Sequence, residues 1–217
     1  MSFPNAQKGI KKIYIGELLM LISIVLTTVS DIALLIFSAP EEVSDATVGA
    51  SVIGLVVFSV AASLLTVFAL IFSIIGVIQT SKDEPLFKGV IAVMLLSVGV
   101  TVVSAIFTEN QLVTKLTSVI NEVSGTITIV LIVFGIGKMA EKLGNDDVFV
   151  RGQTLLRIII WIALLSVIIK AVAAFAPYSV VLVLDIIMLI GTGVLEVVEY
   201  FLYLSFLNKT KKMLAQS

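Results

Sequence analysis

The sequence predicts an all-α, polytopic integral membrane protein with six transmembrane helices, arranged as three antiparallel hairpin repeats with both termini in the cytoplasm. Its composition is the first indication, because 59% of the 217 residues are hydrophobic and 13% are charged, about half the charged share of a typical soluble domain. The mean hydropathy of +1.18 is the second. A soluble domain of this size has too little interior to bury so much apolar surface.

Six apolar stretches are each long enough to cross a bilayer, which takes about 20 residues in a helix. The first stretch follows three lysines and is too long for the core of a signal peptide, so we expect it to remain as a span. The second, fourth and sixth exceed the minimum and must tilt or continue as helix beyond the lipid. In chain order the six stretches are residues 13–38, 48–80, 86–108, 113–139, 154–175 and 178–207.

The basic residues between these spans predict their direction. Only Lys115 lies in a segment on the opposite side from the N-terminal tail, and Lys170 lies within a span. Positive charge is retained on the cytoplasmic side, so we expect both termini there, in the plasma membrane and, in a bacterium, the inner membrane. The remaining Lys and Arg all share the side of the N-terminal tail: Lys8, Lys11, Lys12, Lys82, Lys88, Lys138, Lys142, Arg151, Arg157, Lys209, Lys211 and Lys212.

The spans also pair into hairpins. We expect a single transmembrane domain, residues 1–217, with repeat units of approximately 9–84, 85–148 and 149–213. The three descending ends have a small residue followed three positions later by a polar one, a recurrence typical of internal repeats. The alternative is that any cytoplasmic helix end has this composition. The recurring pairs are Gly76 with Gln79, Gly135 with Lys138, and Ser205 with Asn208.

Two residue types are missing altogether. The chain has no Cys and no His, which removes disulfides, thiolate sites, Cys nucleophiles and the most common metal ligand and general base. The net charge of −1 argues against a nucleic-acid partner, which requires clustered positive charge. We therefore expect no enzyme activity, no cofactor, no metal site and no nucleic-acid partner. The expected partners are the lipid bilayer and either another membrane protein or a second copy of the chain.

The sixth span carries the most informative polar residues. Asp185, Thr192, Glu196, Glu199 and Tyr203 recur at steps of seven, four, three and four, which places them on one helical face. Carboxylates are costly to expose to lipid, so this face is expected to point toward other helices or a wet cavity. For the two glutamates, structural pairing and a substrate or proton role are both open.

Four charged residues are expected at a similar depth in the outer leaflet. Asp31 and Lys170 lie about seven and about five residues from the outer ends of their spans, and Asp185 lies about seven from its own. An Asp31–Lys170 pair is the first possibility, Asp185–Lys170 is its competitor, and Glu122 joins the same layer. Lys170 alternatively extends to the interface without a partner.

Stripes of uncharged polar residues follow several spans. The third span has Ser97 and Thr101, the fourth has Asn121, and the second has Ser63 and Thr66. Such residues most often pack against neighbouring helices or donate a hydrogen bond to the carbonyl four residues earlier. We expect this structural role for most of them.

Two functions fit these patterns. The first is a small transport or permeation protein for a cation, proton or small solute that uses the acidic face of the sixth helix. The alternative is a non-catalytic membrane subunit, scaffold or immunity-type protein that binds a partner within the bilayer. An intramembrane aspartic protease is disfavoured, since Asp31 and Asp185, the deep aspartates, lie in neither a YD nor a GxGD sequence.

Overall fold

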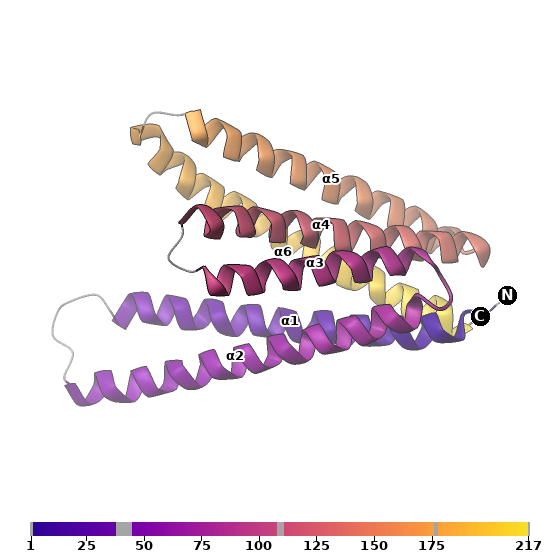
Figure 1. Ribbon diagram of the computed structural model, residues 1–217, viewed down its shortest axis with the longest axis horizontal. Helices are drawn as coiled ribbons and strands as arrows, with labels where there is room; N and C mark the ends of the chain where they lie inside the picture. Colours follow the sequence, from indigo (N-terminus) through magenta and orange to yellow (C-terminus); the bar gives the residue numbers. More distant parts are fainter. Residues whose placement is uncertain (1, 38–44, 108–110, 176–177, 217) are drawn as a thin grey trace. The chain divides into compact units, whose positions relative to one another are not determined.

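The computed structural model (Figure 1) describes the backbone of residues 2–37, 45–107, 111–175 and 178–216. Side chains are described for residues 2–30, 54, 56–107, 113, 116–117, 119–121, 123–165 and 197–216. Over this part of the chain the structure is helical and contains no strand.

The described backbone forms six α-helices. Each helix overlaps one of the predicted apolar stretches, and four boundaries coincide with the predicted ones: Thr80, Leu86, Phe175 and Tyr178. Several helices extend beyond the apolar stretch into polar sequence, as α1, α5 and α6 do, because helical backbone hydrogen bonds form between polar residues as well. In chain order the helices are α1 (Pro4–Phe37), α2 (Asp45–Thr80), α3 (Leu86–Ile106), α4 (Gln111–Lys142), α5 (Asp146–Phe175) and α6 (Tyr178–Gln216).

Among the described residues, five helical segments are long and apolar enough to cross a membrane. They are Pro4–Ser30, Val56–Thr80, Leu86–Ile106, Val119–Lys142 and Asp146–Leu165. The protein is therefore a helical chain suited to span a membrane. The sixth predicted span begins in a part of α6 whose side chains lie outside the described residues, so it stays a prediction, as do the hairpin repeats and the single domain.

The chain divides into two compact units, which are considered separately. One unit contains residues Lys11–Gly76, and the other contains Met1–Ile10 together with Val77–Ser217. We call them the α1–α2 unit and the main unit.

In the α1–α2 unit, small and hydroxyl residues bring the two helices together. Ser23 Oγ donates to the carbonyl of Ala62 at 2.8 Å and lies 2.7 Å from Thr66 Oγ1. A Cβ added at Gly16 would lie 2.8 Å from the carbonyl oxygen of Ala69, so only glycine permits this approach. Ser63 donates to the carbonyl of Ser59, which confirms the predicted structural role for this hydroxyl. Thr27 makes the same kind of bond to the carbonyl of Ser23.

The core of the main unit lies at one end, which we call the turn end. It comprises the N-terminal segment, the α2–α3 turn at residues 81–85, the α4–α5 turn at residues 143–145 and the C-terminal part of α6, which gather at the same end in Figure 1. Phe87, Ile136, Met139 and Leu207 are fully buried there. Consecutive helices of this unit contact one another: α3 with α4, α4 with α5 and α5 with α6.

Away from the turn end, α3 and α4 meet through polar side chains. Ser97 Oγ donates to Asn121 Oδ1 at 2.9 Å, and Asn121 Nδ2 donates to Thr101 Oγ1 at 3.1 Å. Thr101 and Asn121 belong to the predicted polar stripes of two different spans. Their contact confirms that these residues join neighbouring helices.

Candidate functional site

The predicted acidic face of α6 is described over its last two members. Tyr203 is buried, with 1% of its surface exposed, and Glu199 is half-buried. Residues on the other faces of the same turns, Val197, Phe201 and Leu202, are exposed. At this end of α6, Tyr203 is therefore buried, whereas several apolar side chains one turn around it are exposed.

The side chains of the other predicted site residues lie outside the described part of the chain. The side chains of Asp185, Thr192 and Glu196 on α6 lie outside the described residues. The same holds for the proposed charge group, with Asp31 on α1, Lys170 on α5 and Glu122 on α4. These residues keep their helical positions, and their roles stay predictions.

The α4–α5 turn fixes the start of α5. Gly144 has a φ of +66°, a left-handed conformation that glycine adopts readily at the end of a helix. Asn145 N then donates to the carbonyl of Ala140 at 2.9 Å, and Asn145 Oδ1 accepts from Val148 N at 3.1 Å. Asn145 thus caps the N-terminus of α5, which positions the acidic first turn of that helix.

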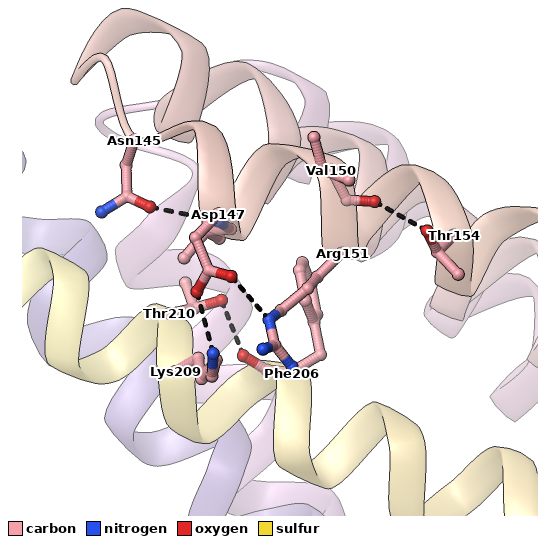
Figure 2. A network of polar contacts seen from close by, with 9 residues as sticks. Asn145, Asp147, Val150, Arg151, Thr154, Phe206, Lys209 and Thr210 are labelled. Carbon is pink, nitrogen blue, oxygen red and sulfur yellow. Dashed lines mark hydrogen bonds and ion pairs between the residues drawn. The ribbon is translucent and has the colours of Figure 1, made fainter.

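A three-residue charge network joins α5 to α6 directly after this cap (Figure 2). Asp147 accepts from Arg151 Nε at 2.9 Å through Oδ1 and from Lys209 Nζ at 2.8 Å through Oδ2. All three side chains are at least 37% exposed. Exposed ion pairs contribute little to stability, so this network orients its side chains more than it holds the helices together. It contains two cations and one anion and carries a net positive charge.

A second charged cluster ties the N-terminal segment to the α2–α3 turn. Asp83 Oδ2 accepts from the backbone N–H groups of Asn5 and Ala6 at 2.8 and 2.7 Å, and its Oδ1 accepts from Asn5 Nδ2. The first turn of a helix leaves its N–H groups without intrahelical partners and carries a partial positive charge. Asp83 accepts from two of these N–H groups at the start of α1 and places a negative charge beside them, although it lies far away in the sequence.

The neighbouring glutamate belongs to the same cluster but is buried. The side chain of Glu84 is 4% exposed, and its Oε2 lies 2.8 Å from Lys142 Nζ. The same ammonium lies 5.9 Å from the centre of the Phe3 ring, within reach of a cation–π attraction. Because a buried carboxylate is costly without a partner, this pair is a structural element of the turn end.

The sequence analysis did not predict these turn-end contacts, because it used the charges outside the spans only to predict orientation. A signal was present: an acidic pair precedes or opens two helices, Asp83-Glu84 before α3 and Asp146-Asp147 at the start of α5. Acidic residues are favoured at helix N-termini. Over the described side chains, no group of three or more His, Cys, Asp or Glu is arranged to hold a metal ion.

Comparison with known proteins adds no family to this picture. No protein-family model, curated protein or solved structure matches the chain. What the chain does must therefore be inferred from its own residues.

Proposed function

We propose that the chain is a small membrane transport or permeation protein in which the acidic face of α6 lines the path of a cation, a proton or a small solute. The observation that supports this is the inward position of the described end of that face. Tyr203 is 1% exposed while Leu202 beside it is 40% exposed. In the proposed topology six spans form three hairpins, with the turn end in the cytoplasm.

The proposed path uses residues that share one face of α6 by helical spacing. Glu196 and Glu199 supply negative charge for a cation or exchange a proton, and Asp185 extends the acidic face toward the outer leaflet. Thr192 and Tyr203 add hydroxyls along it. Intramembrane carboxylates mark ion and proton pathways in many membrane proteins. Lys170, near Asp31 and Glu122 in the proposed layer, serves as a countercharge.

Flux into proteoliposomes tests this proposal. Purified chain is reconstituted, and proton, Na⁺ and K⁺ entry is followed under an imposed gradient. The double variant Glu196→Gln/Glu199→Gln is expected to lose most of the flux that the unaltered chain supports. Glu141→Gln is the matched control, because Glu141 is exposed on α4 and lies off the proposed path. Equal flux through the double variant and the unaltered chain would refute the role of α6.

A second function is favoured by a different observation. The outer parts of α3 and α4 form an apolar groove with exposed side chains, including Leu95, Leu96, Val103 and Leu116. A non-catalytic subunit, scaffold or immunity-type protein would use such a surface to bind a partner helix inside the bilayer. Purification in mild detergent separates the two proposals. A stoichiometric membrane partner supports the second, and a homogeneous chain that conducts ions supports the first.

A further inference from the structure

The facing sides of α5 and α6 enclose a partly open groove of about 180 Å³ near the turn end. Its lining residues follow the same helical spacing on both antiparallel helices, so they form three matching levels along the groove. The lining is Arg151, Thr154, Leu155 and Ile158 from α5, with Leu202, Ser205, Phe206 and Lys209 from α6.

The level nearest the turn end is cationic. Arg151 and Lys209 stand on opposite helices, and Asp147 bridges them. Arg151 uses Nε for this bridge, so its outer Nη donors lie at the end of a side chain that is 51% exposed. A guanidinium fork matches the geometry of a phosphate. Because the bridge is exposed and weak, a phosphate is able to compete with Asp147 for both cations.

The levels below are apolar, apart from two hydroxyls. Leu155 and Phe206 are buried in the middle level, and Leu202 is exposed at the far level. Arg151 and Ile158 are seven residues apart, which corresponds to about 10 Å along a helix. The groove therefore offers a cationic end and an apolar wall of a length that suits a headgroup and the upper part of an acyl chain.

We propose that this α5–α6 groove binds one anionic phospholipid, with the phosphate between Arg151 and Lys209 and an acyl chain along Leu155, Ile158 and Phe206. The charge of the rim and the apolar wall together fit an amphiphile with a negative head. Basic pockets between membrane helices bind anionic headgroups in this way. The loop charges place the turn end in the leaflet that is rich in such lipids.

Glycine explains why the groove has this form. A Cβ added at Gly152, which lies one residue after Arg151, would meet the Phe206 ring at 3.3 Å. The missing side chain lets Phe206 pack against α5 and form the wall of the groove. The lipid site thus depends on a close contact between the two helices as well as on the charges.

Lipid binding to the full-length chain in detergent, measured by native mass spectrometry, tests the proposal. Phosphatidylglycerol is expected to bind in one-to-one stoichiometry and more tightly than phosphatidylcholine with the same acyl chains. Arg151→Gln/Lys209→Gln is expected to weaken phosphatidylglycerol binding by about fivefold for each cation removed. Lys88→Gln/Lys212→Gln, with the same change in net charge at exposed lysines outside the groove, is expected to leave it unchanged.

Two further variants keep the test informative if removal of the cations disturbs the fold. Asp147→Asn keeps both cations and removes the carboxylate that competes with the lipid phosphate for them, so phosphatidylglycerol should bind more tightly. Ser205→Phe keeps all charges and fills the middle of the groove, so binding of the lipid should be lost.

Three outcomes would overturn the proposal. One is equal binding of phosphatidylglycerol and phosphatidylcholine. Another is an equal loss of binding in the Lys88/Lys212 control, which would indicate interface electrostatics only. The third is displacement of the lipid by glycerol phosphate at the same concentration, because the headgroup chemistry alone would then account for binding.

Discussion

The two ends of the α3–α4 pair are packed in opposite ways. At the turn end, Phe87 is fully buried. Its ring packs directly against Gly135, because a Cβ added at Gly135 would lie only 2.6 Å from Phe87 Cε2. Toward the other end of α3, Leu95, Leu96 and Val102 are more than half exposed. The same two helices therefore interlock at one end and present apolar surface at the other.

The difference shows which contacts hold helices together when lipid is the solvent. Apolar side chains gain little from leaving lipid for a helix interface, so close packing and hydrogen bonds decide association. At the turn end a glycine and an aromatic ring supply close packing. At the other end Asn121 supplies hydrogen bonds to Ser97 and Thr101, and the apolar side chains remain available to lipid or a partner.

The largest expected effect distinguishes the two ends directly. Phe87→Ala should lower the free energy of unfolding by about 3–5 kcal/mol, because it leaves a cavity beside Gly135. Phe107→Ala makes the same chemical change at the exposed end of α3, where the side chain is 52% exposed, and should have little effect. Unfolding in mixed detergent measures both. Similar losses for the two variants would show that the other end of α3 is packed as tightly as the turn end.

A smaller effect is expected at the buried ion pair of the turn end. Lys142→Gln should lower the free energy of unfolding by about 1–3 kcal/mol, because it leaves the buried Glu84 carboxylate without its cation. The loss should be smaller than for a fully buried ion pair, because the Lys142 side chain is 42% exposed. The double variant Glu84→Gln/Lys142→Gln should recover part of this loss. Arg151→Gln breaks the exposed bridge and serves as the control, with little expected change. Equal stability of the Lys142 variant and the unaltered chain would contradict the structural role of Glu84.

The smallest effect is expected at the polar contact of Asn121 with Ser97 and Thr101, away from the turn end. Asn121→Leu removes both hydrogen bonds to α3 and should cost about 0.6–1 kcal/mol, the usual range for polar contacts between membrane helices. Ser63→Ala is the matched control, because that hydroxyl bonds only within its own helix in the described structure. A loss as large as that of Phe87→Ala would reverse the comparison and make Asn121 the main contact between α3 and α4.

Local sequence properties predicted the helices well. Apolar runs broken by charged or small residues marked the helix ends at Thr80 and Leu86 closely, since both hydropathy and helix formation depend on neighbouring residues. The extension of α6 to Gln216 was not predicted, because its last turns are polar and only packing of Met213 and Leu214 accounts for them. The acidic face of α6 was predicted from spacing alone and stays a prediction, because the side chains of Asp185, Thr192 and Glu196 lie outside the described residues.

The sequence by itself determined that this is a helical, membrane-spanning chain, because composition and periodicity require no knowledge of contacts. The tertiary structure decided which charges meet. Asp83 caps α1 across 78 residues and Lys209 reaches Asp147 across 62, and such pairs depend on how the helices pack. The six spans, their orientation and the acidic path were inferred from patterns. The α5–α6 groove depends on the antiparallel packing of two consecutive helices, which brings its lining residues together.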